Sequence, residues 1–237
     1  PMSIMRASAA AGWIDILFKA HGHGTALLGG RRPGDVLSVM GPIGVPFRLE
    51  GYRRRPLLIG GGVGIPPMIY LAEHMRAADE DLQPLVLMGS EVPFPFRSRP
   101  SAIMVDGLPP DCLAAMPLLE DWHIASRLAS TQGYAGCFDG FVTDLARAWL
   151  DAVGTGSHAE VEIFACGPTP MLRAVQRLAA EYTLPGQLSL EEYMACAVGG
   201  CAGCAVRLET PDVPAMKRVC VDGPVFEAAS VVFPEPA

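Results

Sequence analysis

The sequence has no apolar run long enough to cross a membrane. Its longest apolar stretch, PLLIGGGVGIPPMIYLA at 56–72, is interrupted by four glycines and two internal prolines, whereas a membrane span needs about 20 consecutive apolar residues. The N-terminal segment also has no apolar core before a cleavage site, because Asp15 interrupts it, so it does not resemble a secretory signal. We therefore expect a soluble, cytoplasmic protein with no membrane span.

Positive charge is also scarce. The formal net charge is −7, the isoelectric point is near 5.2, and no Lys/Arg cluster is longer than the three arginines of YRRRP at 52–56. Such a chain would repel a phosphate backbone. The composition predicts that nucleic acid is not a partner. We find no internal repeat or low-complexity tract.

What is present indicates a folded protein of several parts. With 237 residues, half of them hydrophobic, the chain can bury a sizeable core and form two or three small domains. Short apolar runs with Gly/Pro punctuation predict strands at 1–51, including 13–20 and 35–40. Strand and helix patterns then alternate through 52–186, which predicts a doubly wound parallel sheet. Predicted strands lie at 56–59, 84–90, 122–129 and 160–168. Predicted helices lie at 140–153 and 170–182, with an earlier one where apolar residues have helical spacing over 68–75, and a long proline-rich loop lies at 90–112.

Two glycine turns follow predicted strands. LLIGGGVGIPPM places Gly61, Gly62 and Gly64 before a helix whose N-terminus would face an anionic group. ACGPTPM repeats this geometry, with Cys166 ending a strand and Gly167 following it. The first motif is not a G-x-G-x-x-G fingerprint, and a lone glycine loop is weak evidence. Two such loops at the carboxyl ends of strands nevertheless define the crevice in which open α/β sheets bind ligands.

The composition changes to cysteine, glycine and alanine from about residue 187. Four of the seven cysteines form C-x4-C-x2-C-x15-C: Cys196, Cys201, Cys204 and Cys220. A disulfide framework is expected in smaller secreted domains, and structural zinc normally uses paired C-x2-C knuckles; zinc remains the second reading. The spacing matches plant-type [2Fe–2S] sites. The small residues between the cysteines allow the backbone to wrap closely around such a cluster.

Together these motifs resemble a known family. PMSI, LFK, GHGT, GPIG, GGGVGIPP, GFVTDL, ACGPTPM and VCVDGPVF are similar to the ferredoxin–NAD(P) reductase superfamily, and most closely to electron-transfer subunits of two-subunit, NAD-dependent dihydroorotate dehydrogenases. The resemblance covers nearly the whole chain, except the longer stretch 91–120. It implies a multi-domain α/β plus β fold: part of a flavin-binding β-barrel (1–51), an NAD-binding α/β domain (52–186) and a small [2Fe–2S] domain (187–237).

The resemblance also implies flavin contacts. An Arg-Pro-x-Ser motif binds FAD in that family, and here the arginine would precede Pro1, so we expect residues before position 1 to complete the barrel. A chain without its first barrel strands would bind FAD weakly or not at all. The matching positions are Pro1, Met2, Ser3, Leu17, Phe18, Lys19, Gly24 and Thr25. By the same resemblance Cys166 and Gly167 would lie near the nicotinamide, and Gly61, Gly62 and Gly64 near the dinucleotide phosphates.

The implied activity is that of an oxidoreductase in pyrimidine biosynthesis. Electrons would pass from a partner dihydroorotate dehydrogenase subunit containing FMN, in a heterotetramer, through [2Fe–2S] and FAD to NAD⁺. Two alternatives remain open at this stage: an NAD(P)H reductase subunit of another redox complex, and a zinc-binding interaction module on a degenerate nucleotide fold. The cofactor also stays open, because Glu91 favours NAD at a ribose hydroxyl whereas Arg97 and Arg99 would suit the phosphate of NADP.

Overall fold

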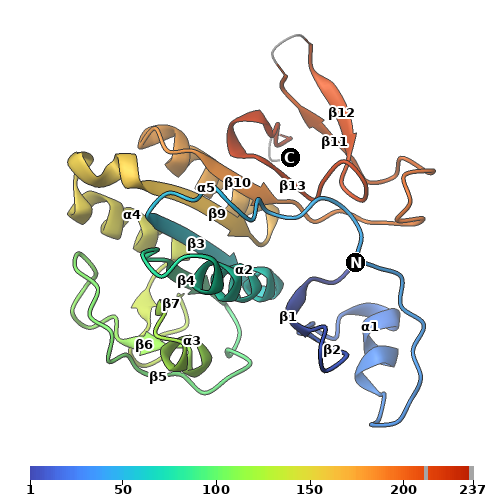
Figure 1. The fold of residues 1–237 in the computed structure, drawn as a ribbon, viewed down its shortest axis with the longest axis horizontal. Coiled ribbons are helices and arrows are strands. Elements are labelled where there is room, and N and C mark those ends of the chain that lie inside the picture. The colour runs from blue at the N-terminus through green and yellow to red at the C-terminus, as the bar shows by residue number, and fades with distance from the viewer. Residues whose placement is uncertain (211–212, 235–237) are drawn as a thin grey trace.

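A computed structural model describes residues 1–210 and 213–234, and its centre is a seven-stranded sheet (Figure 1). Every neighbouring pair of strands is parallel except β10 and β13, the pair at one edge of the sheet, which is antiparallel. In spatial order the strands are β13 (Val225–Glu227), β10 (Gly186–Ser189), β9 (Val161–Cys166), β3 (Arg55–Gly61), β4 (Leu85–Gly89), β7 (Ala125–Ser130) and β8 (Phe138–Asp139).

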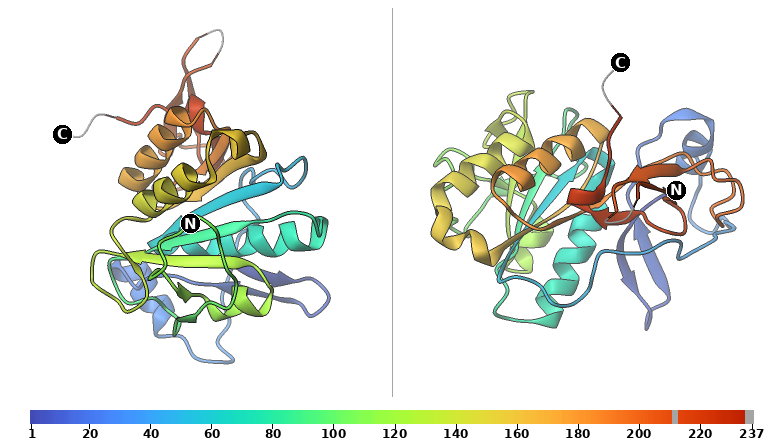
Figure 2. Two further views of the ribbon diagram at one scale, coloured as in Figure 1. Left: turned by 90° about the vertical axis from the view of Figure 1, so that its left-hand side faces the viewer. Right: turned by 90° about the horizontal axis from the view of Figure 1, so that it is seen from above.

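Helices cover both faces of this sheet, as Figure 2 shows from the side. Alternate residues of β3 divide between two apolar cores: Leu57 and Ile59 pack with α4 and α5, and Leu58 packs with α2 and α3. The helices are α2 (Ile65–Ala78), α3 (Pro117–Asp121), α4 (Val142–Val153) and α5 (Thr169–Glu181), with 3₁₀ turns η1 (Gly62–Gly64), η2 (Thr155–Glu160) and η3 (Ala228–Ser230). The predicted doubly wound parallel sheet is therefore confirmed.

The N-terminal segment is only partly β. Strands β1 (Ile4–Ser8) and β2 (Trp13–Ile16) form a hairpin, but Gly22–Gly29 form helix α1, and 35–40 form no strand. The prediction of strands throughout 1–51 was therefore wrong for these two stretches. At 35–40 the apolar residues have no neighbouring strand; Val36 is 92% exposed. An apolar pattern forms a strand only where a partner edge satisfies its backbone.

The hairpin lies against the central sheet's first helix. Strand β1 contacts α2. The guanidinium of Arg6, on β1, lies 5.6 Å from the centre of the Trp122 ring, and the guanidinium of Arg76, on α2, lies 5.3 Å from the same ring centre. Cations stacked on an indole face attract its π-electrons. These contacts join the N-terminal segment to the part of the chain that forms the central sheet and its helices.

The cysteine-rich segment leaves and re-enters the sheet at neighbouring strands. It runs between β10 and β13 and carries a hairpin of β11 (Ala205–Leu208) and β12 (Ala215–Arg218). The predicted boundary between 186 and 187 falls inside β10, so this segment shares a strand with the sheet. The division into 1–51, 52–186 and 187–237 stays a prediction.

The proline-rich stretch 90–112 is mostly irregular, as predicted. Its one strand, β5 (Arg99–Pro100), pairs with β6 (Ala114–Ala115). Across 1–210 and 213–234, the helices are all too short or too polar to pass through a lipid bilayer.

Candidate functional site

The two glycine turns meet at the carboxyl edge of the sheet. Gly60 pairs with Cys166 across β3 and β9, so both strands end at the same level. A Cβ atom built on Gly64 would lie 2.1 Å from the carbonyl oxygen of Cys166. Only glycine permits this approach, because real side chains never come so close. The sequence prediction that these loops converge is confirmed.

Met171 lies between the turns and was missed by the sequence analysis. Its Sδ atom would be 2.4 Å from a Cβ on Gly61, and its Cε atom 2.6 Å from one on Gly167. Both glycines therefore make room for the same side chain of α5. The signal in the sequence was the methionine of ACGPTPM, one turn into the helix that follows the strand.

Cys166 is buried at the centre of this edge. It is 8% exposed and pairs with Gly60 on one side and Ser189 on the other. Burial raises the pKa of the Cys166 thiol to about 12, although the Ser189 hydroxyl opposes this shift. Cys166 is therefore a neutral thiol at physiological pH, suited to packing against a ligand and unsuited to acting as a nucleophile.

A polar cluster follows the next two strands. Gly61, Gly89 and Ala129 are aligned across β3, β4 and β7. Glu91 lies two residues beyond this line, and its Oε2 atom accepts hydrogen bonds from Thr131 Oγ1 and from Gln132 Nε2, the latter at 3.3 Å.

The hydrogen bond from Thr131 is the main reason that the pKa of Glu91 lies below its usual range. A fixed carboxylate thus stands one strand away from the glycine turn. Thr131 and Gln132 were not found from the sequence, although polar residues directly after a strand were the available signal. Arg99, one of the alternatives for binding a phosphate, instead donates to Asp121 at 2.6 Å.

The four cysteines of the C-terminal segment lie together as two pairs. Cys201 N–H donates to Cys196 Sγ at 3.4 Å, and the side chains of these two cysteines also interact. Cys220 lies beside Cys204; burial, then the Cys204 thiol, raises the pKa of Cys220. The structure records all seven cysteines as free thiols. Cys220, the distant fourth cysteine, thus lies beside a cysteine of the loop, and the assignment of all four as metal ligands stays a prediction.

Backbone N–H groups point at the sulfur atoms of the first pair. Besides the contact from Cys201, Gly203 N–H donates to Cys201 Sγ at 3.4 Å. Hydrogen bonds from the backbone of Cys201 and Val198 lower the pKa of Cys196 to about 6. The loop achieves this shape with positive φ angles at Ala197, Gly199 and Ala202. Such a concave row of N–H groups suits a negatively charged sulfur centre.

The four cysteines of this segment offer four thiol ligands. Among the residues that the structure describes, no group of three or more His, Cys, Asp or Glu side chains is already arranged to hold a metal ion. A [2Fe–2S] cluster binds four thiolates and has two iron atoms. Two neighbouring cysteine pairs, with N–H groups directed at sulfur, match that donor set.

The residues matched to flavin contacts lie in the N-terminal segment. Ile4 pairs with Ile16, so residues 1–3 and 17–19 lie at the same open end of the hairpin. Thr25 lies on α1, where its hydroxyl donates to His21 O at 2.5 Å and accepts from His21 N at 2.7 Å. The hydroxyl therefore has local partners. The residues that stay proposed flavin contacts are Pro1, Met2, Ser3, Leu17, Phe18, Lys19, Gly24 and Thr25.

The N-terminal segment touches the cysteine module directly. Val45 N–H donates to Gly223 O at 2.5 Å, and a Cβ on Gly44 would lie 2.3 Å from the same oxygen. Gly223 is three residues after Cys220. The GPIG motif at 41–44 therefore packs its backbone against the turn that carries the fourth cysteine.

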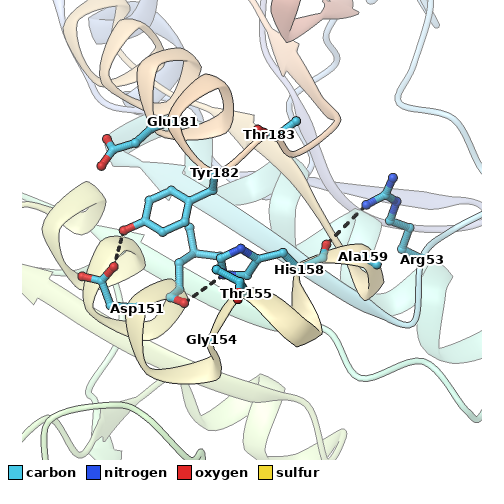
Figure 3. A pocket seen from close by; sticks show the side chains of 10 residues that line it. Arg53, Asp151, Gly154, Thr155, His158, Ala159, Glu181, Tyr182 and Thr183 are labelled. Atoms are coloured by element: carbon cyan, nitrogen blue, oxygen red, sulfur yellow. Dashed lines mark hydrogen bonds between the residues drawn. The ribbon is translucent and has the colours of Figure 1, made fainter.

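A surface hollow lies elsewhere, at the amino edge of the sheet. Its volume is about 720 Å³, and its rim includes Arg53, Asp151, His158 and Tyr182 (Figure 3). These side chains largely bond to their neighbours: Tyr182 to Asp151, His158 to Leu150 O at 3.1 Å, and Arg53 to His158 O at 3.4 Å. The glycine turns lie at the opposite ends of the strands, so this hollow is separate from the candidate site.

Comparison with known proteins agrees with this geometry. Residues 191–232 match the iron-sulfur cluster binding domain of dihydroorotate dehydrogenase B. Over 98% of its length the chain is similar to the solved NADH-dependent reduced ferredoxin–NADP oxidoreductase, with a TM-score of 0.69, 23% identity and 73% of that chain covered. A ferredoxin reductase in carbazole 1,9a-dioxygenase, in its FAD apo form, gives a TM-score of 0.52 and 22% identity over 77% of this chain and 49% of that one. The chain therefore has the fold of these ferredoxin reductases, and its residues 191–232 form an iron–sulfur cluster binding domain.

Sequence relatives identify the family. The chain is 31% identical to the dihydroorotate dehydrogenase B (NAD(+)), electron transfer subunit of Geobacillus sp. (strain WCH70) and 34% identical to that of Bacillus caldolyticus, in each case over 98% of this chain and 79% of the relative. The chain belongs to the family of dihydroorotate dehydrogenase B electron transfer subunits.

Proposed function

We propose that this chain receives electrons from a dihydroorotate-oxidising partner subunit and delivers them to NAD⁺. The observation that supports this most strongly is the pairing of Cys196 with Cys201 and of Cys204 with Cys220. These residues would hold a [2Fe–2S] cluster, which supplies one-electron transfer. The protein contributes position, charge and access.

The glycine crevice is the proposed NAD site. Gly61, Gly62 and Gly64 precede α2, whose N-terminus favours a pyrophosphate. Glu91 stands where the adenosine ribose would lie, one strand along, and its carboxylate would accept a hydrogen bond from a ribose hydroxyl. Its negative charge would repel the additional phosphate of NADP. Cys166 and Gly167 would contact the nicotinamide.

The flavin site is proposed at the open end of the hairpin of β1 and β2. Residues 1–3 and 17–19 lie there together, with Gly24 and Thr25 on α1. FAD would exchange a hydride with the nicotinamide and single electrons with the cluster. Support for this placement comes from the motifs and from the contact of Gly44 with Gly223, which joins the N-terminal segment to the cysteine module.

The partner is proposed to be an FMN-containing dihydroorotate dehydrogenase subunit, in a heterotetramer. The test is to co-express the full-length protein with that subunit, purify the complex and measure NAD⁺ reduction with dihydroorotate as the electron donor. We expect NADH formation that requires both subunits. A stable complex that oxidises dihydroorotate with an artificial acceptor but never reduces NAD⁺ would overturn the proposal.

A further inference from the structure

One arginine bridges the two parts of the cysteine set. Arg218 Nη1 donates to the carbonyl oxygen of Gly199 at 3.0 Å. Gly199 lies in the loop between Cys196 and Cys201, whereas Arg218 precedes the fourth cysteine, Cys220, by two residues. A Cβ on Gly199 would lie 3.1 Å from Nη1. The absence of a side chain there lets the guanidinium reach the loop.

Asp222 holds the guanidinium in this position. Its Oδ2 atom accepts from Arg218 Nε at 3.0 Å and from Arg218 N at 2.7 Å, and its Oδ1 atom accepts from Nη2 at 3.3 Å. Such a two-pronged contact fixes the plane of a guanidinium, and its charge makes it stronger than neutral hydrogen bonds. A lysine in this place would keep the charge but lose the fork.

The backbone around Arg218 forms the turn that presents Cys220. The carbonyl oxygen of Arg218 accepts from the N–H groups of Val221 at 3.2 Å, Asp222 at 2.8 Å and Gly223 at 3.2 Å. Val219 N–H donates to Cys204 O at 3.0 Å. The backbone of Arg218 therefore stabilises this turn, and its side chain binds the loop that carries Cys196 and Cys201.

The charge of Arg218 acts on the second cysteine pair. Its guanidinium is bonded to the loop between Cys196 and Cys201, its own residue lies two positions before Cys220, and the next residue, Val219, is bonded to Cys204 O. A guanidinium stays protonated at physiological pH, so a fixed positive charge lies within the cysteine set. A nearby cation stabilises the more negative, reduced form of a cluster, while the Asp222 carboxylate opposes it.

We propose that Arg218, held by Asp222, positions the cysteine loop against Cys220 and raises the reduction potential of the cluster bound there. The inference rests on the proposed function, because it assumes the [2Fe–2S] cluster. It assigns opposite electrostatic effects to two neighbouring residues. A purely structural role would change the potential in the same direction for both.

The test uses Arg218→Gln, Arg218→Lys and Asp222→Asn in the full chain. Arg207→Gln is the control, because Arg207 is an exposed arginine of the same module that pairs with Glu209 at 2.9 Å. Reduction potentials are measured by spectroelectrochemical titration, and cluster stability by the rate of iron loss to a chelator. These measurements need neither the partner subunit nor catalytic turnover.

We expect Arg218→Gln to lower the potential and Asp222→Asn to raise it. Arg218→Lys should lie closer to the unaltered protein in potential than Arg218→Gln, yet lose iron faster, because it keeps the charge without the fork. Loss of an outer contact to a metal site typically weakens it roughly 10- to 100-fold, and we expect Arg218→Gln to lose iron faster by such a factor. Arg207→Gln should change neither quantity.

An unchanged potential in Arg218→Gln, or a shift in the same direction in Arg218→Gln and Asp222→Asn, would overturn the inference. If Arg218→Gln retains no cluster, the other two variants decide: Asp222→Asn must raise the potential and Arg218→Lys must lose iron faster. If the unaltered protein has no iron–sulfur spectrum, the proposed function fails, and the inference fails with it. A normal spectrum with unaffected variants refutes the inference alone.

Discussion

Gly64 lies directly against the peptide of Cys166, with space for a hydrogen atom and none for a methyl group: a Cβ would lie 2.1 Å from the Cys166 carbonyl oxygen and 2.3 Å from its carbonyl carbon. This contact joins the turn after β3 to the end of β9. The close packing of the two turns of the proposed NAD site therefore requires glycine at position 64.

Gly64→Ala should separate these turns. Because the neighbouring atoms are backbone, they can move only by distorting β9 or α2, and overpacking of this kind costs about 1–3 kcal/mol. We expect a lower melting temperature and weaker NAD⁺ binding by calorimetry. Gly156→Ala is the control, since a Cβ there would meet no atom within 4 Å. Equal melting temperatures for the two variants would contradict the prediction.

Cys201→Ala should prevent assembly of the cluster. One of four thiolates would be lost from a centre that needs all of them, and the surrounding loop has too small a core to order itself. Iron analysis and visible absorbance of the purified chain provide the measurement. Cys137→Ala, which changes a cysteine outside the motif, should keep full iron content. Stoichiometric iron in Cys201→Ala would show that the ligand set is wrong.

The iron-free protein should show a pH-dependent thiol at Cys196. The pKa of Cys196 falls from its ordinary value of 9.0 to about 6 on folding, chiefly because of backbone N–H groups. The thiolate therefore stabilises the folded loop fully above about pH 9, and this contribution declines as the pH falls from 9 to 6 and is absent below 6. Alkylation of Cys196 by iodoacetamide, followed by mass spectrometry, should have a midpoint near pH 6. A midpoint near 9 would mean that the N–H groups do not face the sulfur.

Glu91→Ser should relax the preference for NAD⁺ over NADP⁺. Removing the carboxylate removes its repulsion of the additional phosphate, and we expect kcat/KM for NADP⁺ relative to NAD⁺ to rise roughly tenfold, equivalent to about 1.4 kcal/mol. Glu80→Gln serves as the control, because Glu80 is exposed before β4 at the amino edge of the sheet. A ratio that changes equally in both variants would show that Glu91 does not contact the ribose.

Cys166→Ala should slow hydride transfer without removing the cofactors. If Cys166 packs against the nicotinamide, the lost contact loosens the reacting geometry, and we expect a reduction of roughly 10- to 100-fold in NADH oxidation with an artificial acceptor. Flavin and iron content should stay unchanged. Cys112→Ala alters another buried cysteine, one outside the glycine turns, and should retain the rate. A normal rate in Cys166→Ala would remove this residue from the site.

The sequence predicted the parts of the protein whose structure depends on local patterns. The alternation of strands and helices from β3 to α5 and the convergence of Gly64 with Cys166 were evident from periodicity and spacing. The helix at Gly22–Gly29 was not, because α1 has small and apolar residues and buries none of them. The hydrogen bonds between the Thr25 hydroxyl and the backbone of His21, at the start of this helix, were not evident either.

Contacts between distant segments were the other gap. Glu91 could be placed at the end of a strand, but its partner Thr131 lies 40 residues away and became apparent only when β4 and β7 were paired. Nothing in the sequence around Arg218 distinguishes it from an ordinary surface arginine. Its role depends on a contact with Gly199, which the fold alone creates.

The pairing of β10 with β13 also determines how the cysteine module can move. Ser189 pairs with Val225, so the chain leaves the sheet and returns to it on adjacent strands, about 4.8 Å apart. Cys204, Val219 and Cys220 are continuous with the core beneath. Two adjacent strands therefore anchor the module to the sheet, unlike a carrier domain that moves between its electron donor and acceptor on a flexible linker. If the cluster and the flavin bind as proposed, electron delivery should be independent of solvent viscosity once the partner has docked, because folding then sets the distance between the two carriers.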